Sequence, residues 1–587
     1  MADKRTQDEA AWFTSPNTEQ QNHRRYEALR SYFVDHLTLA EAATKHGYPY
    51  WTFVNLVRDH RANKLTLFTP RKPPGPPKGI APAKDRARGR VIELRREGLS
   101  VYEISAHLAA QGMALNRTSV GEILQEEGFG RLIRHPHPEA STSPPTPGRD
   151  TQLPKTAPLK INELSPTMTT RHAGLLLLLP DLLALNLPGA VQAAGYPASG
   201  PLSPLNWILS LLALKLTGVR RLSHVDDLLL ADPAASLFTG LAHLPKKTAL
   251  TDYSYRTCHN NQTALLANLA IAMDREHLTN PAGVFNLDFH TIMHWGHDPV
   301  LEKHYVPTRS QRARSTLAFL AEDHHTGNLV YANTDLTKAT QAYEPIAFCD
   351  HWKQATGHDP NTLVMDQKVT TGHHLGLLNE RGIKFITLRA RSQPLIRHIN
   401  TLTPTDYQTT TLNRPGPFNR PKYHQDPAVN ITGYPATVRQ LIVTGLGHSK
   451  PTIIITNDHT SSPRQLITTY AHRMGIEQRI AEIIRAFNTD ALSSTVNLNV
   501  DLDLALCVWA HATVAHLANR LPGYQGKTPD TIQRRFLQTP GTITTTPNHI
   551  TINLDRRAYT PTLRQAHLPQ NTPIPWLNNT PLTYHLN

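Results

Sequence analysis

The sequence predicts an α/β protein whose sheet is preceded by helical modules. Residues 283–292, 315–322 and 328–335 are apolar stretches of strand length, and His-His-Thr-Gly between the last two is typical of a hairpin turn. Beyond them helices and strands alternate along the chain. These segments are the helix 345–356, the strand 361–366, the helix 373–381 and the strand 384–388.

Hairpin-like strands followed by alternating helices and strands are the order of a ribonuclease-H-like sheet, which we expect to occupy residues 251–520. Residues 392–447, rich in Thr, Pro and Asn, are predicted to form a β-rich insertion, after which residues 452–456 resume the sheet. Two long helices follow, at 464–487 and 498–519. A C-terminal extension with short strand-like pieces occupies residues 521–587.

Proline-rich stretches divide the N-terminal part of the chain. Residues 69–84 and 135–160 are predicted linkers, because proline lacks a donor N–H and resists helix. They separate two small helical modules, at 20–68 and 85–134, from a dominantly helical domain at 165–250.

Both small modules have the pattern of a helix-turn-helix. Thr38-Leu-Ala-Glu41 is a capping box at a helix start, and residues 51–60 are predicted to be the second helix. The second module repeats the plan with boxes at Ser100-Val-Tyr-Glu103 and Ser119-Val-Gly-Glu122. In such modules the second helix can lie in the major groove of DNA.

Basic residues lie beside the second helix of each module. They are Arg58, His60, Arg61 and Lys64 in the first, and Arg117, Arg131 and Arg134 in the second. Ordinary helical hairpins with solvated basic faces would show the same pattern. Two modules in tandem, in a chain with a formal net charge of +14, favour double-stranded DNA as the partner, because neutralising phosphates releases counterions.

Composition places the chain in a reducing compartment. Its three cysteines are far apart in sequence and form no Cys-x-x-Cys pair, and the polar N-terminus has no signal-peptide core. The most apolar stretch, 174–185, is shorter than the ~20 residues of a bilayer span. We interpret 174–185 as a buried helix rather than a membrane anchor or a partner-binding surface, and we expect a cytoplasmic, nucleoid-associated protein.

Three acidic residues are the candidate catalytic and metal-binding groups. Asp288 lies in an apolar strand, Asp366 follows another, and Glu477 is in the predicted helix 464–487. Carboxylates at strand ends suit two Mg²⁺ or Mn²⁺ ions, which can drive phosphoryl transfer. Each residue by itself has a simpler interpretation: an Asp at a strand end is often a turn or cap residue, and Glu477 has Glu482 as a near neighbour.

The segment Tyr470-Ala-His-Arg473-Met-Gly-Ile-Glu477 resembles the Tyr-x-x-Arg-x-x-x-Glu signature of insertion-sequence transposases of the IS-four (YREK) type. Pro451-Thr-Ile-Ile-Ile-Thr-Asn resembles the strand that leads into that helix in the family. The regions around Asp288 and Asp366, the latter followed by Arg381-Gly-Ile-Lys-Phe-Ile, resemble those of its two aspartates. The resemblance covers about residues 170–520.

This resemblance implies a DDE transposase that nicks DNA at the element's ends and joins the freed 3′-hydroxyl to target DNA. Asp288, Asp366 and Glu477 would be the metal ligands, and Tyr470 and Arg473 would contact DNA near the scissile phosphate. A homodimer or higher multimer on DNA is implied as well. The chain departs from the family where a Lys should follow the Glu by seven residues: the position is Ile484, and the nearest base is Arg485.

Other chemistries are weaker alternatives. His290, His294 and His297 lie near one another, as zinc ligands can, but the apolar run before them predicts a strand, in which the i, i+4 spacing of His290 and His294 has no meaning. The phosphate-binding pattern Gly-x-x-x-x-Gly-Lys-Ser/Thr is absent from the sequence. Two further functions stay open: a domesticated, non-catalytic DNA-binding regulator, and a ribonuclease-H-fold nuclease without strand transfer.

Overall fold

The structure is a computed structural model, and its chain divides into two compact units, residues 1–148 and 149–587. Lys64, Ser100, Arg131, Arg134, His294 and His297 lie outside the residues that the structure describes. The described residues are 18–62, 65, 82–96, 99, 101–113, 115, 117–126, 156–218, 228, 232–293, 302–306, 311–367, 369–413, 418–447, 450–488 and 499–586.

The first small module is a three-helix cluster. Its helices are α2 (Thr18–Phe33), α3 (Leu39–Lys45) and α4 (Tyr50–Arg61). The predicted capping box is confirmed: the Glu41 N–H donates to Thr38 Oγ1 at 3.3 Å, and the Thr38 N–H donates to Glu41 Oε2 at 2.9 Å. Gly47 takes a φ of +67° in the turn before α4. Phe53 and Val57 of α4 pack on Ala28, Leu29, Ala42 and Ala43.

The second module is also helical, with a small core of its own. Its helices are α5 (Pro82–Arg96), α6 (Val101–Ala110) and α7 (Arg117–Glu126). The predicted capping box at Ser119 is wrong, because α7 already begins at Arg117. Ser119 therefore lies inside the helix, whereas an N-cap residue needs non-helical backbone angles.

The larger unit is mixed α/β, as predicted, with two sheets. The strands of the larger sheet are β2 (Val284–Met293), β3 (Lys303–Val306), β4 (Gln311–Asp323), β5 (Leu329–Asn333), β6 (Thr362–Met365), β7 (Lys384–Leu388), β8 (Gln408–Thr409), β9 (Lys422–Asn430), β10 (Thr437–Thr444) and β11 (Thr452–Thr456). Their order is β3-β4-β2-β6-β7-β11-β10-β9-β8, and β5 pairs with β4. Strands β2, β4 and β5 pair antiparallel, whereas β2, β6 and β7 are parallel.

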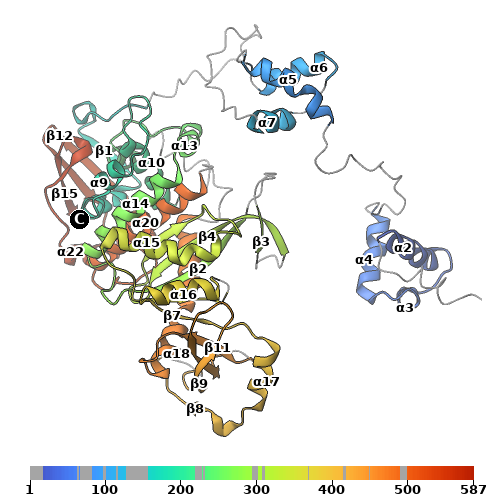
Figure 1. The fold of residues 1–587 in the computed structure, drawn as a ribbon. Helices are drawn as coiled ribbons and strands as arrows, with labels where there is room; N and C mark the ends of the chain where they lie inside the picture. The colour runs from blue at the N-terminus through green and yellow to red at the C-terminus, as the bar shows by residue number, and fades with distance from the viewer. Residues whose placement is uncertain are drawn as a thin grey trace, which may run out of the picture. The chain divides into compact units, whose positions relative to one another are not determined.

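The segment predicted as a β-rich insertion contains β8, β9 and β10, and these strands extend the larger sheet through β11. It also contains α17 (Gln393–Thr401), which the sequence analysis missed. Ser392 caps that helix by accepting from the Leu395 N–H, and a proline follows in the first turn. Figure 1 shows α17, α18 (Pro463–His472) and β8–β11 grouped as one lobe of the larger unit.

Helices cover the larger sheet and bury its apolar side chains. They include α14 (His259–Arg275), α15 (Glu344–Thr356), α16 (Gly372–Glu380), α19 (Met474–Phe487) and α20 (Val500–Arg520). Of the helices in the described part of the chain, α20 is the one with the length and apolarity to cross a bilayer, yet 72% of its apolar window is buried inside the protein. Burial of that kind is typical of a core helix.

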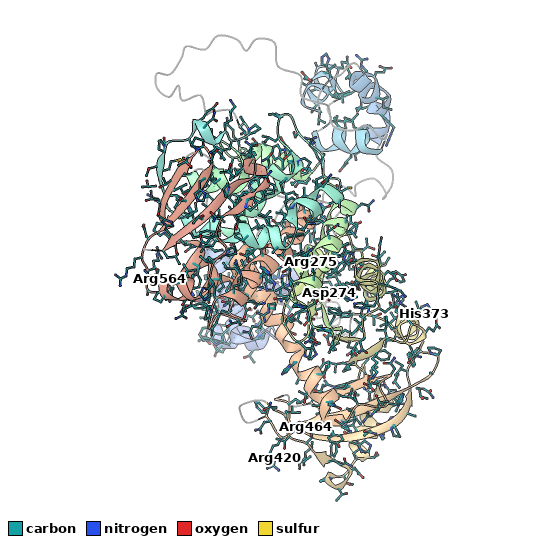
Figure 2. The ribbon with its side chains drawn as sticks, turned by 90° about the vertical axis from the view of Figure 1, so that its left-hand side faces the viewer. Asp274, Arg275, His373, Arg420, Arg464 and Arg564 are labelled. Atoms are coloured by element: carbon teal, nitrogen blue, oxygen red, sulfur yellow. The ribbon has the colours of Figure 1, made fainter. Side chains whose placement is uncertain are left out.

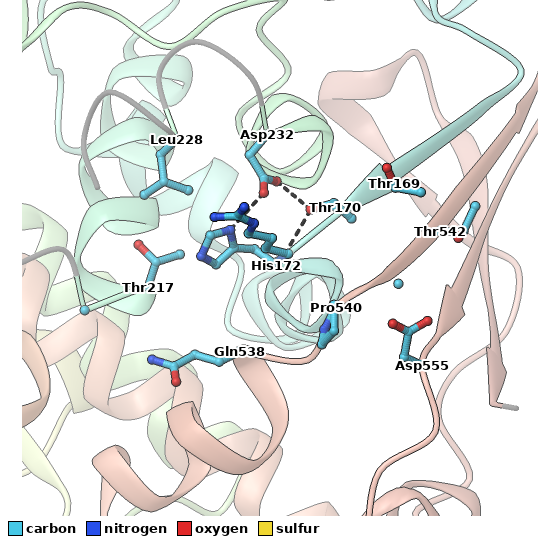
Figure 3. A pocket seen from close by; sticks show the side chains of 13 residues that line it. Thr169, Thr170, His172, Thr217, Leu228, Asp232, Gln538, Pro540, Thr542 and Asp555 are labelled. Atoms are coloured by element: carbon cyan, nitrogen blue, oxygen red, sulfur yellow. Dashed lines mark hydrogen bonds and ion pairs between the residues drawn. The ribbon is translucent and has the colours of Figure 1, made fainter. Parts of the chain in front are cut away.

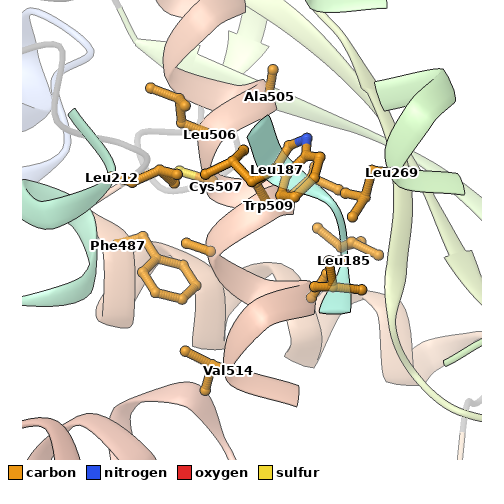
Figure 4. Packing of buried hydrophobic residues seen from close by; sticks show 14 of the residues in the cluster. Leu185, Leu187, Leu212, Leu269, Phe487, Ala505, Leu506, Cys507, Trp509 and Val514 are labelled. Carbon is orange, nitrogen blue, oxygen red and sulfur yellow. The ribbon is translucent and has the colours of Figure 1, made fainter. Parts of the chain in front are cut away.

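The leucine-rich stretch is buried, as predicted. It forms the short helices η2 (Ala173–Leu178), α8 (Leu179–Ala184) and α9 (Leu187–Ala193) rather than one helix. Asn186, with a φ of +56°, separates α8 from α9. Figure 4 shows Leu185 and Leu187 packed with Leu269 of α14 and Trp509 of α20.

A smaller sheet joins the two ends of the larger unit. Strand β1 (Thr167–Thr170) pairs antiparallel with β12 (Gly541–Thr546), and β13 (His549–Leu554), β15 (Thr580–Leu586) and β14 (Thr572–Ile574) follow in that order. The remaining helices here are α10 (Pro204–Leu216), α12 (Pro233–Thr239), α13 (Lys247–Ser254), α21 (Pro529–Ile532) and α22 (Thr560–Gln565). The predicted helical domain, sheet domain and C-terminal extension thus share one continuous hydrophobic core.

Trp509 is the largest fully buried side chain of this core, and its indole N–H donates to the Leu265 carbonyl at 3.3 Å. We expect Trp509→Ala to lower the free energy of unfolding of the larger unit by about 3–5 kcal/mol, because it leaves a large cavity. Chemical denaturation monitored by circular dichroism would measure it. Tyr255→Ala, at a side chain 55% exposed, should change the value by no more than about 0.5 kcal/mol. Equal values for the two variants would contradict the packing described.

Candidate active site

The register of two parallel strands brings Asp288 and Asp366 together. Leu287 of β2 pairs with Met365 of β6, so the next residue on each strand is one of the two predicted aspartates. Leu287 and Met365 are fully buried in the core, and since side chains alternate along a strand, Asp288 faces away from it. The two aspartates are therefore neighbours on adjacent interior strands: Asp288 lies inside β2, not at its end as expected, and Asp366 directly follows β6.

Arg473 joins Asp288 to Glu477. Its guanidinium lies 3.3 Å from Asp288 Oδ2 through Nη1 and 3.5 Å from Glu477 Oε1 through Nη2. The Arg473 side chain is only 6% exposed, that of Asp288 is 17% exposed and that of Glu477 is 56% exposed. A buried cation thus sits between an acid on β2 and an acid in the first turn of α19.

The predicted helix 464–487 is two helices, α18 and α19, that meet at Arg473. The prediction of one helix is wrong because the Arg473 N–H donates to the Tyr470 carbonyl, three residues back, and tightens the last turn of α18. Arg473 closes α18 and opens α19. Tyr470 therefore belongs to α18 and Glu477 to α19.

Burial and like charges raise the pKa of Asp288. Burial is the largest cause; Glu477 and Asp366 raise the pKa further, while Arg473 and the Phe289 N–H lower it. For Arg473, burial lowers the pKa, but Tyr470 and the three acids outweigh it, and the net shift is upward. The three predicted acids and Arg473 therefore act on one another electrostatically, as members of one site do.

Tyr470 is buried beside the same arginine. The Arg473 guanidinium lies 5.8 Å from the centre of the Tyr470 ring, and burial raises the pKa of the phenol to about 12. The phenol is thus neutral at physiological pH. It can donate a hydrogen bond or pack against a ligand, but it is a poor nucleophile.

A cavity of about 510 Å³ opens at this site, and its lining includes Asp366, Glu477, Tyr470 and Arg473. Two more arginines, Arg389 and Arg391, line it. Arg389 Nη1 donates to Gln440 Oε1 at 2.6 Å, and Arg391 Nη2 donates to the Pro451 carbonyl at 2.6 Å. The cavity therefore pairs carboxylates with fixed guanidinium groups, an arrangement suited to a phosphate diester.

Arg389 and Arg391 are site residues that were not predicted from the sequence, although the sequence carries a signal for them. Arg389 directly follows β7, as Asp366 follows β6, and Arg391 comes two residues later; β6 and β7 are parallel. The carboxyl ends of parallel strands meet at one edge of a sheet. Arginine is so common on surfaces that its position after one strand does not separate a site residue from a solvated one.

The structure separates Glu477 from its neighbour Glu482. Glu482 is 3% exposed and accepts from Arg479 Nη1 at 2.7 Å and from Gln478 Nε2 at 3.0 Å. Arg479 also lies 3.7 Å from Glu322 of β4. These buried groups fasten α19 to the sheet, so Glu482 has a structural partner whereas Glu477 faces the cavity.

The other predicted site residues lie elsewhere. Arg485 is exposed in the last turn of α19 and is not among the residues that line the cavity. Arg58 and Arg61 belong to α4, in the smaller unit. Arg117 begins α7 in that unit. His290 lies in β2, so the helical spacing that a zinc site with His294 would need is not present there.

A second cavity, of about 880 Å³, lies near the smaller sheet (Figure 3). Asp232 in its wall caps α12 by accepting from the N–H groups of Ala234 and Ala235, and it also bonds Thr170 and His172. Both oxygens of its carboxylate thus accept hydrogen bonds from within the protein. Residues on both sides of Leu228, another lining residue, lie outside the described part of the chain.

The chain was also compared with known proteins. It matches no protein-family model, and no curated protein matches it.

Burial raises the pKa of Glu322 from 4.5 to about 7, against the opposing effect of Arg479. A raised pKa means that the stabilising neutral form is fully present below pH 4.5 and is lost as the pH rises through about 7. We therefore expect the free energy of unfolding to fall by about 3 kcal/mol across this window.

Denaturation of the larger unit at a series of pH values would measure this change. Glu322→Gln should flatten the profile in this window, whereas Glu380→Gln, at an exposed position on α16, should not. An unchanged profile in the Glu322→Gln variant would show that another group carries the pH dependence.

Proposed function

We propose that the protein is a DDE transposase, which cleaves DNA at the ends of an insertion sequence and joins them to target DNA by two-metal-ion phosphoryl transfer. The observation that carries the proposal is the meeting of three acids: Arg473 joins Asp288 to Glu477, and the register of β2 and β6 brings Asp366 beside Asp288. The Tyr-x-x-Arg-x-x-x-Glu signature selects Glu477, and the two regions that resemble the family's aspartate regions select Asp288 and Asp366, from segments far apart in sequence.

The strand order supports a ribonuclease-H-like fold for this domain. The strands β5-β4-β2 form an antiparallel meander, and β6 and β7 continue beside β2 in parallel, with α15 and α16 as the connections. A meander followed by two parallel crossovers is the order expected for that fold. It places Asp288, inside β2, near Asp366 and Arg389, which directly follow β6 and β7.

The donor set fits divalent cations. The site offers carboxylate oxygens, which suit Mg²⁺ or Mn²⁺, and mutual repulsion contributes to the raised pKa of Asp288. Arg473 partly offsets this repulsion now, and bound cations would relieve it further. Two ions held by these oxygens would activate a water or a 3′-hydroxyl and stabilise the leaving oxygen.

The remaining residues of the cavity bind and orient DNA in this proposal. Arg389 and Arg391 are held by the fold with N–H groups at the cavity wall, where guanidinium suits phosphate oxygens. Arg473 keeps Asp288 and Glu477 in place, and Tyr470 offers a neutral hydroxyl near the scissile phosphate. Exposed arginines on the neighbouring lobe, Arg420 and Arg464 in Figure 2, extend the basic surface.

Helix α4 is the proposed groove-reading helix of the first module. Its exposed residues Trp51, Asn55 and Arg58 are spaced i, i+4 and i+7 and so share one face, while Phe53 and Val57 face the core. Asn and Arg are the side chains that read adenine and guanine in the major groove. Arg61 instead packs over Phe33, 5.6 Å from its ring centre.

The proposed setting is cytoplasmic and nucleoid-associated, with two DNA ends held by a homodimer or a larger multimer. A non-catalytic DNA-binding regulator remains the second candidate. The intact set of three acids around a buried arginine argues against it, because a DNA-binding role alone does not need them.

Asp288→Ala, Asp366→Ala and Glu477→Ala should each reduce metal-dependent nicking of the DNA that flanks the coding sequence by about a thousandfold or more, because loss of a ligand removes several kcal/mol of transition-state stabilisation. Gel assays with Mg²⁺ or Mn²⁺ would measure nicking, and gel shifts should show unchanged DNA binding.

Glu380→Gln is the matched control and should retain wild-type activity, since Glu380 is exposed on α16. Undiminished nicking by the Asp288→Ala variant would overturn the site. A wild-type chain that nicks in neither metal favours the regulator, and nicked product that is never joined to a target plasmid favours a nuclease.

Arg58→Ala should weaken binding to the same duplex by about 1–3 kcal/mol, as loss of a groove contact does. Titration at several salt concentrations would measure the affinity. Arg564→Ala, at an exposed arginine of α22, is the control and should bind as the wild type does. Equal affinities for both variants would exclude α4 as the reading helix.

A further inference from the structure

A second group of metal-ligating side chains lies in the lobe that follows β7. His398 of α17 and His424 and Asp426 of β9 offer ligand atoms that all lie within 4.8 Å of one another. Among the described residues it is the one group of this kind that the geometry selects. His424 and Asp426 are two residues apart on one strand, so both side chains point to the same face.

The spacing of these atoms matches a tetrahedral zinc site. Asp426 Oδ1 lies 3.4 Å from His398 Nε2 and 3.2 Å from His424 Nε2. Zinc binds His nitrogen and carboxylate oxygen at about 2.0–2.2 Å, and two tetrahedral ligands at that distance are about 3.3–3.5 Å apart. Both distances to Asp426 Oδ1 agree with ligands that share one zinc ion, and the ligand nitrogens of His398 and His424 lie within 4.8 Å of each other.

The surroundings orient the ligands for a metal. His424 Nδ1 lies 3.0 Å from the Asp406 carbonyl oxygen, and a proton on Nδ1 leaves Nε2 with a free lone pair. Asp426 Oδ2 accepts from Gln440 Nε2 at 2.7 Å, which leaves Oδ1 for the ion. Metal-binding His and carboxylate groups commonly have such outer partners.

We propose that His398, His424 and Asp426 hold a zinc ion, with water as the fourth ligand. Two imidazoles and one carboxylate favour zinc over Mg²⁺, which prefers oxygen ligands. The ion clamps α17 onto β9, which the chain reaches only after strand β8. All three side chains reach solvent, so a water can complete the coordination.

The clamp also acts on the proposed active site. Asp426 holds Gln440, and Gln440 Oε1 accepts from Arg389, which lines the catalytic cavity. Zinc thus holds the Asp426 carboxylate in place. Asp426 in turn orients Gln440, and Gln440 orients Arg389. This positioning role rests on the proposed function, whereas zinc binding itself does not.

Metal analysis of the full chain tests the site without DNA. The purified protein is stripped with a chelator, incubated with Zn²⁺ in excess Mg²⁺ and dialysed, and its zinc content is measured. We expect the wild type to keep one zinc equivalent more than the His398→Ala and His424→Ala variants. Co²⁺ in place of zinc should give a tetrahedral absorption spectrum that both variants lose.

His459→Ala is the matched control, because His459 is an exposed histidine outside the cluster, and it should keep the full zinc content. The His398 side chain is 42% exposed, so its removal leaves the core unchanged, and circular dichroism would verify the fold. Equal zinc content in wild type and both variants, or none in the wild type, would overturn the proposal and leave only histidine–aspartate hydrogen bonds.

The zinc site and the proposed DNA cleavage are tested independently of each other. A chain that binds zinc through this cluster but never nicks DNA keeps the zinc site and loses the proposed function. If both hold, Asp288→Ala should keep its zinc, and His398→Ala should nick more slowly while retaining binding of Mn²⁺ at the acids.

Discussion

The larger unit depends on one buried cation, Arg473, at the junction of two helices. Its guanidinium reaches Asp288 on β2 and Glu477 on α19, and its side chain is almost entirely removed from water. Taking a charge out of water costs several kcal/mol unless opposite charges compensate it. Asp288 and Glu477 therefore hold the arginine in place as much as it holds them.

Two sets of buried polar contacts keep α19 against the sheet. On the side of the cavity, Arg473 contacts Asp288 and Glu477. On the opposite side, Arg479 pairs with Glu482 and lies near Glu322 of β4. Between them the apolar residues Ile476, Ile480 and Ile483 pack into the common core. Apolar packing fixes the distance of the helix from the sheet, and the charged groups fix its rotation. Rotation decides that Glu477, and not Glu482, faces the cavity.

The lobe that follows β7 is connected to the cavity by strand pairing and by hydrogen bonds. Its strands continue the sheet through β11, so the lobe and the catalytic edge form one hydrogen-bonded surface. Contacts that run from Asp426 through Gln440 to Arg389 link the lobe to the cavity wall. A ligand held in the lobe can therefore affect the cavity without touching it, through this chain of hydrogen bonds.

The sequence by itself determined the types of the elements and the three acids. Alternating and periodic apolar residues predicted β2, β4, β6, β7 and α15, and the local spacing of Tyr470, Arg473 and Glu477 selected the third acid. Those patterns are local and can be read along one segment. Only the tertiary structure decided that Asp288 and Asp366 are neighbours, that β1 pairs with β12, and that His398 meets Asp426. Strand pairing and side-chain contacts between distant segments depend on packing of the whole core, which no single segment encodes.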